Sequence, residues 1–198
     1  MAKVLIADDK PDVCRALEAT LKSAGHSVVA ATTVEKAVKF LELSRSSEPF
    51  EVVVVDLWFE NYEGALRGPS EAGLIVVDKA LEDRLVEIIV LTAHGTTKTA
   101  AEACAVGVFR YLEKGERDDY IDSSGGLMKE IVGSVAEAVA VRDQLRKLSE
   151  MLYCLGEVLS EARKIGTDVE VVKQGQVILS MAREILELLL RYRGKKTK

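Results

Sequence analysis

Acidic side chains follow two apolar runs in the first third of the sequence. Asp8 and Asp9 follow the run KVLIA, and Asp56 follows the run EVVVV. If both runs are parallel strands, the three carboxylates meet at one edge of a sheet, where clustered oxygen ligands suit a hard cation such as Mg²⁺. Each acid alone is equally compatible with an ordinary strand end that meets water. Together they predict a Mg²⁺ site at that edge.

Two later residues add a hydroxyl and an ammonium group to the same edge. Thr92 ends the run VEIIVLT, and Lys114 follows the run GVFRYL. On the other side of Asp56, these groups could hold two oxygens of a phosphoryl group. Such a set of groups is typical of phosphoryl transfer to a carboxylate, in which catalysis is mainly positioning and charge neutralisation.

The elements that position these groups alternate along the first 112 residues. We predict strands over residues 3–7, 26–31, 51–56, 86–92 and 107–112, with helices over 11–24, 70–83, 96–106 and after a capping-box pattern of Thr32 and Glu35. Strands that alternate with helices predict a doubly wound α/β fold with a parallel sheet. In such folds the functional residues lie at the carboxyl ends of the strands.

Four motif blocks resemble those of the response-regulator receiver domain of two-component signalling. They are LIADD, VVVVDLW, IIVLTAHGT and YLEKG, and their order and spacing match over about residues 1–140. The resemblance implies a flavodoxin-like five-stranded sheet. It implies that a sensor histidine kinase phosphorylates Asp56, and that Mg²⁺ is the cofactor. The implied metal ligands are Asp8, Asp9, Asp56 and the backbone carbonyl of Trp58.

The same resemblance assigns the remaining roles at the site. Asp56, Thr92 and Lys114 would be the catalytic residues, with Thr92 and Tyr111 as the switch pair. Tyr111 could instead be simple strand packing. His94 could modulate access to the phosphate or lie on the surface without consequence. The chain would then be no enzyme in its own right, but a phosphoacceptor that assists its own phosphotransfer and dephosphorylation.

The sequence after about residue 125 has helical periodicity and predicts no further strand. Leucines follow a coiled-coil spacing of three and four, and they are the predicted dimer contacts: Leu145, Leu148, Leu152, Leu155 and Leu159. A second apolar stripe flanks them from Met151 onward, and a similar helix follows Gly166. We predict a receiver over residues 1–140 and a helical hairpin or coiled-coil extension over 141–198. The hairpin is expected to form a homodimeric four-helix bundle, and packing against its own receiver is the alternative.

The amino-acid composition limits which other binding partners are expected. The net charge of −5, the pI near 5.3 and the absence of a helix–turn–helix spacing argue against nucleic-acid binding. No apolar run approaches the roughly 20 residues of a membrane span, so we expect a cytoplasmic protein with no membrane contact. Cys14, Cys104 and Cys154 are predicted to be buried and unpaired. We expect the helical output to bind an unknown protein; the alternatives are a DNA-binding regulator with an unrecognised helical effector and a phosphorelay intermediate.

Overall fold

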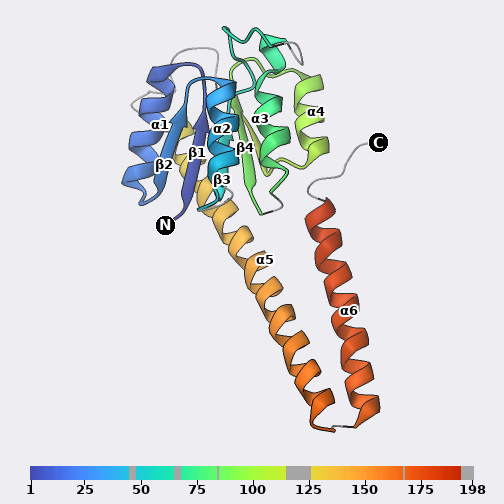
Figure 1. Cartoon of the computed structure of the whole chain (residues 1–198). Helices are drawn as coiled ribbons and strands as arrows, with labels where there is room; N and C mark the ends of the chain where they lie inside the picture. Colours follow the sequence, from blue (N-terminus) through green and yellow to red (C-terminus); the bar gives the residue numbers. More distant parts are fainter. Residues whose placement is uncertain (45–47, 65–67, 84, 115–125, 167, 193–198) are drawn as a thin grey trace.

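The structure is a computed structural model that describes residues 1–44, 48–64, 68–83, 85–114, 126–166 and 168–192 (Figure 1). Five parallel strands form one sheet in the order β2-β1-β3-β4-β5. Their bounds are β1 (Lys3–Ala7), β2 (Ser27–Ala31), β3 (Val52–Val55), β4 (Glu87–Thr92) and β5 (Arg110–Glu113). This order confirms the predicted flavodoxin-like, doubly wound fold.

Helices cover both faces of the sheet. They are α1 (Pro11–Ser23), α2 (Val34–Ser44), the short η1 (Pro69–Glu71), α3 (Gly73–Ala80), α4 (Thr97–Val106), α5 (Gly126–Lys164) and α6 (Val169–Tyr192). Helix α1 and the first part of α5 lie on one face, and α2, α3 and α4 lie on the other (Figure 1). Val52 and Val54 pack on the side of α1 and α5, whereas Val53 and Val55 pack on the side of α2, α3 and α4. Because both faces of β3 are buried, its sequence is an unbroken run of valines.

The helix ends explain one error in the predicted elements. Helix α1 begins at Pro11, where the missing N–H costs nothing, and ends before Gly25, whose φ is +88°. At the start of α2, the Thr33 hydroxyl oxygen accepts the N–H of Lys36 at 3.2 Å. The capping prediction at Thr32 is therefore wrong by one residue, because the helix begins at Val34 and its cap is the residue directly before it.

Helix α5 belongs to both predicted parts of the chain. It runs for 39 residues without a break. In its first half Ile131, Val135 and Ala138 are fully buried against the sheet. Arg142 then donates to the Leu85 carbonyl and to Glu51, each at 2.9 Å. The proposed boundary between residues 140 and 141 falls inside this helix, so the division of the chain at that point stays a prediction.

Beyond Arg142, α5 leaves the sheet and α6 returns antiparallel beside it, so that the pair projects away from the sheet (Figure 1). Leu152, Leu179 and Leu186 are buried between the two helices, and Leu145, Leu159 and Ala182 pack around them. Three of the five leucines predicted as dimer contacts therefore contact α6 of their own chain. The other two, Leu148 and Leu155, are 37% and 39% exposed.

Two further expectations can be compared with the described residues. The three cysteines are free, but only Cys14 is buried; Cys104 and Cys154 are exposed, so the prediction of burial is wrong for these two. Both occupy outward positions of helices, which periodicity alone did not separate from inward ones. Among the described residues, the helices are too short or too polar to cross a membrane. The basic C-terminal residues 193–198 lie outside the described residues.

Candidate functional site

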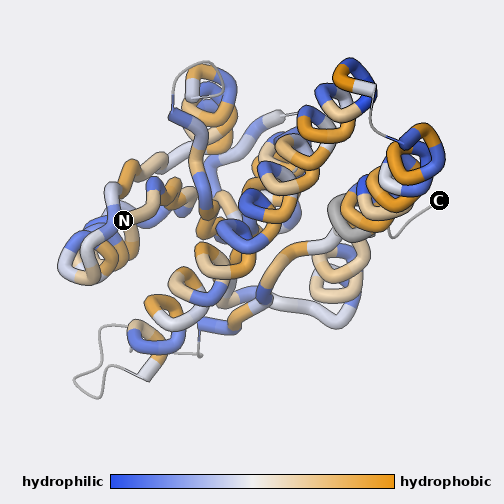
Figure 2. The backbone as a smooth tube through the Cα atoms, turned by 90° about the horizontal axis from the view of Figure 1, so that it is seen from below, coloured by the Kyte–Doolittle hydropathy of each residue, from blue (hydrophilic) through white to orange (hydrophobic). Residues whose placement is uncertain are grey.

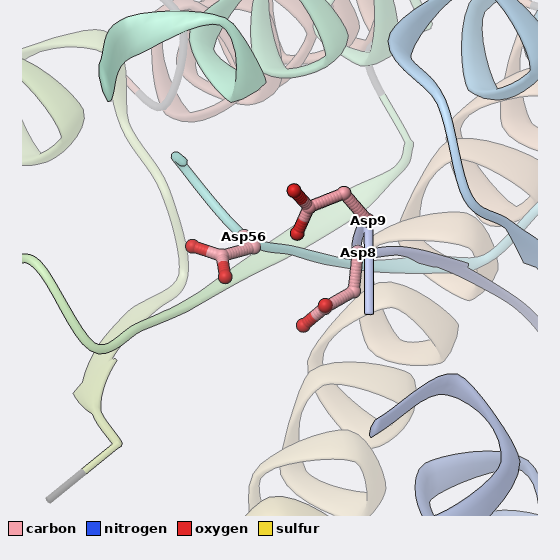
Figure 3. Close-up of side chains that lie close together, drawn as sticks. All are labelled: Asp8, Asp9 and Asp56. Carbon is pink, nitrogen blue, oxygen red and sulfur yellow. The ribbon is translucent and has the colours of Figure 1, made fainter. Parts of the chain in front are cut away.

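Three carboxylates lie together at the carboxyl edge of the sheet. Asp8 and Asp9 follow β1, and Asp56 follows the neighbouring β3, at the point where the strand order reverses. One oxygen from each carboxylate lies within 4.8 Å of the others. Figure 3 shows the three side chains close together at the ends of these two strands. The structure thus brings together the three acids that the sequence predicted as metal ligands.

Backbone N–H groups fix each carboxylate. Asp8 accepts the N–H of Lys10 at 2.9 Å, and Asp56 accepts the N–H of Trp58 at 3.1 Å. In both cases the carboxylate binds the backbone two residues further on, the turn geometry that aspartate favours. Asp9 is held differently, because it accepts the N–H of Glu60 from the loop after β3 at 2.8 Å. The acids are therefore oriented before any ligand arrives.

Lys114 links two of the acids. Its ammonium group donates to Asp8 at 2.5 Å and to Asp56 at 2.6 Å, and its side chain is only 2% exposed. Burial is the largest influence on the pKa of Lys114 and lowers it, but the charges of Asp56 and Asp8 outweigh burial and the pKa is raised. Burial also raises the pKa of Asp8, against the opposing effect of Lys114. Lys114 is therefore charged in this site.

The predicted switch residues lie at the same edge. Thr92 is fully buried at the end of β4, and its hydroxyl oxygen accepts the N–H of His94 at 3.3 Å. Tyr111 is half-buried on β5, with its hydroxyl 3.5 Å from that of Thr99. A Cβ at Gly95 would lie 2.7 Å from this hydroxyl, so Gly95 makes room for it. The position of Tyr111 fits both a switch and a packing role, and its role stays a prediction.

Two rings that follow β3 and β4 contact each other. The rings of Trp58 and His94 are 4.6 Å apart at an angle of 47°. The roles predicted for these two residues, a carbonyl ligand and a modulator of access, both stay predictions. Their contact was not expected, because they follow different strands and no sequence pattern couples them.

Two supporting residues were missed from the sequence. A Cβ at Gly73 would lie 1.9 Å from the backbone oxygen of Asp56, so only glycine lets the start of α3 approach the end of β3 this closely. The Cys14 thiol donates to the Asp8 carbonyl at 3.3 Å, and burial raises its pKa to about 12. The only sequence signal for Gly73 was its place at the start of an apolar helix. No sequence signal marked Cys14 as a contact of Asp8.

The donor set fits a divalent cation. All three acids offer the oxygen ligands that Mg²⁺ prefers, and they are already within 4.8 Å of one another. When all three are ionised, the single charge of Lys114 leaves two negative charges uncompensated. A divalent ion at Asp8, Asp9 and Asp56 would neutralise that excess.

Comparison with known proteins gives the same assignment for this part of the chain. The family model of the response regulator receiver domain matches residues 4–123. An NtrX-like response regulator of Rickettsia bellii is 30% identical over 118 residues, which are 59% of this chain and 22% of that protein. The alginate biosynthesis transcriptional regulatory protein AlgB of Pseudomonas aeruginosa is 23% identical over 180 residues, or 88% of this chain and 37% of that protein.

A solved structure agrees on the fold. The response regulator receiver domain protein of Clostridium thermocellum covers 73% of this chain and 99% of its own length, with a TM-score of 0.55 and 19% identity. At this identity the likeness concerns the fold alone. The chain spans only about a fifth to two fifths of the curated relatives named above.

Proposed function

The chain belongs to the response regulator receiver family, and on this premise we propose that Asp56 accepts a phosphoryl group from a sensor histidine kinase. The observation that carries the proposal is the lysine-bridged carboxylate cluster, in which Lys114 joins Asp56 to Asp8. Such a cluster at a strand-order reversal provides a nucleophile, a cation site and a fixed positive charge within one small space.

Each residue has a definite part in this transfer. An oxygen of Asp56 forms the new bond to phosphorus while the bond from phosphorus to the donor nitrogen breaks, which leaves an acyl phosphate. Lys114 and the Thr92 hydroxyl then bind phosphoryl oxygens. Asp8, Asp9, Asp56 and the Trp58 carbonyl would hold Mg²⁺, and the ion would supply positive charge that offsets the charge of the incoming group. The chain is thus a phosphoacceptor that assists its own phosphorylation and dephosphorylation, and not an enzyme acting on other substrates.

The output of this switch is the helical hairpin. We propose that phosphorylation draws in Thr92 and Tyr111 and shifts a pre-existing equilibrium of the face that carries α5. In this proposal the protein is cytoplasmic, forms a homodimer through its hairpin and signals to another protein. The continuous α5 supports the proposal, because it links the sheet directly to the hairpin.

Phosphoryl uptake tests the central claim. With Mg²⁺ and a small acyl phosphate, the chain should gain one phosphoryl group that both acid and base release. Asp56→Asn should abolish uptake, while Asp78→Asn, which changes an exposed acid on α3, should leave it intact. Normal labelling of Asp56→Asn would refute the assignment of the phosphoacceptor.

A DNA-binding output is the second candidate, because AlgB, which aligns with 88% of the chain, is named a transcriptional regulatory protein. The net charge of −5 argues against it. A gel shift of the full chain at physiological salt separates the two outputs: retardation of DNA favours the second candidate, and free DNA favours a protein-binding hairpin.

A further inference from the structure

The hairpin of α5 and α6 has two unlike faces. A groove of about 910 Å³ runs along one of them and is lined mainly by polar residues of both helices, among them Ser160, Gln176 and Arg183. The row of buried leucines, Leu152 and Leu179 among them, separates this face from the opposite one. Residues three and four apart share a side of a helix. The side of each helix away from the groove can therefore be identified from its spacing.

The face opposite the groove is apolar, and we call it the apolar face. Its centre consists of six exposed side chains: Met151, Leu155 and Val158 of α5, and Ile178, Met181 and Ile185 of α6. Their exposed fractions range from 39% to 68%. Apolar residues recur along both helices, as the orange segments of α5 and α6 in Figure 2 show. On each helix the spacing alternates between three and four, as in helices that pack against other helices.

A glycine on α6 lets the two helices approach closely. A Cβ at Gly175 would lie 2.5 Å from a methyl group of Leu159 on α5. This close approach brings the apolar stripes of α5 and α6 side by side.

The receiver of the same chain does not cover this surface. Helix α5 is continuous and carries the hairpin away from the sheet (Figure 1). Helix α6 has 24 residues, so the hairpin is about 36 Å long and about 20 Å wide, which gives roughly 700 Å² per face. The six exposed apolar side chains lie within this face, and clustered exposed apolar residues of this kind mark interaction sites. A standard interface buries about 800 Å² on each partner.

We propose that a second copy of this chain docks on the apolar face, so that two hairpins form a symmetric four-helix bundle. This inference rests on the homodimer proposed above and names the surface that forms it. A face made of two parallel rows of knobs fits another pair of helices of the same length and spacing, which a second copy supplies. Two-fold pairing of the same patch also closes the assembly, so that both apolar faces are covered at once.

The inference reassigns the predicted dimer contacts. Leu145, Leu152 and Leu159 stabilise the hairpin within each chain, whereas Leu155 and Leu148 face the partner copy. A charge on the apolar face should therefore separate the copies without unfolding the hairpin. A charge at Leu152 should disrupt the hairpin itself.

Matched variants of the full chain test this surface. Light scattering and sedimentation at micromolar concentration should show a dimer for the wild type. Met151→Glu and Ile178→Glu should each raise the dimer dissociation constant by roughly 100-fold or more, because an unpaired charge would be buried at the interface. Their circular dichroism should remain that of the wild type, since both side chains are exposed within one chain.

Tyr153→Glu is the matched control. Tyr153 is 65% exposed, on the same helix, but it lies three residues before the groove residue Gly156. It should leave the dimer unchanged. A monomeric wild type, or a dimer insensitive to both apolar-face variants, overturns the inference. Phosphoryl uptake by the same preparations separates the two proposals: uptake by a monomer refutes this inference alone, and a dimer that takes up no phosphate refutes only the phosphoacceptor.

Discussion

Replacing Lys114 by Met should destabilise the receiver strongly. The substitution keeps the aliphatic stem but removes the ammonium group that contacts Asp8 and Asp56. All three side chains are buried: Lys114 and Asp8 are each 2% exposed, and Asp56 is 7% exposed. Removing one partner from a buried ion pair costs about 3–5 kcal/mol, since the remaining charge is left without compensation. For a protein of this size each kcal/mol lowers the Tm by about 2–4 °C, so the expected loss is roughly 6–20 °C.

The protonation of Asp8 limits this loss and makes it depend on pH. Burial already raises the pKa of Asp8 with Lys114 present, and the pKa should rise further without it. A carboxyl group whose pKa is raised in the folded state destabilises the fold at a pH above its unfolded pKa, which is 3.8 for Asp8. This destabilisation decreases as the pH is lowered and the carboxyl group binds a proton. The deficit of Lys114→Met should thus shrink as the pH is lowered. Thermal melts followed by circular dichroism, without Mg²⁺, measure it.

Two further variants make the result specific. Lys79 also joins two acids, Glu42 at 2.9 Å and Glu82 at 3.4 Å, but it does so at the surface. Lys79→Met should change the Tm far less, because water screens such pairs. Asp8→Asn should restore part of the stability of Lys114→Met, since it removes one uncompensated charge. If Lys114→Met melted at the temperature of the wild type at neutral pH, the lysine could not be the charge that holds the acids together.

Three other predictions follow from the geometry. Mg²⁺ should change the fluorescence of Trp58, the only tryptophan, and Asp9→Asn should shift the titration to higher Mg²⁺; an unchanged signal would contradict the metal site. Gly73→Ala should lower both the Tm and phosphoryl uptake, because its Cβ would overlap the Asp56 backbone, whereas Gly68→Ala, in open space, should change neither. Burial, together with the N-terminal ammonium, lowers the pKa of His26 below its ordinary value of 6.5. As the pH falls, the unfolded state therefore binds a proton at a higher pH than the folded state does. The stability of the fold should decrease as the pH drops below about 6.5. Melts of His26→Gln should show a smaller fall than the wild type, and equal falls would exclude His26 as the cause.

The receiver fold and the acid cluster could be predicted because their signals are local and their positions follow from topology. Each strand is a short apolar run, and a parallel sheet brings the residues after β1 and β3 to one edge. Asp8 and Asp56 are 48 residues apart, yet that rule alone makes them neighbours. By contrast, the contacts of Gly73 with Asp56 and of Trp58 with His94 depend on how loops pack, which no periodicity records.

The tail shows a different limit. Heptad spacing predicts that a stripe is covered by another helix, but it does not say which helix covers it. On α5 the stripe was wide enough to serve two partners. The structure assigns Leu152 to α6 of the same chain and leaves Met151 exposed beside it. Only the placement of α6 buries one of these two adjacent residues and leaves the other exposed.

Helix α5 is attached to the receiver through two sets of hydrogen bonds. On β5, Arg110 is adjacent to Tyr111 and donates to Ser134 at 3.1 Å and to Glu137 at 2.7 Å, both on α5. Near the far edge of the sheet, Arg142 binds Glu51 and the Leu85 carbonyl. From Arg142 the helix continues for about 33 Å to its end, so a rotation of roughly 5° on the sheet moves the hairpin turn by about 3 Å. A displacement of β5 too small to break the core would thus be enlarged at the hairpin turn.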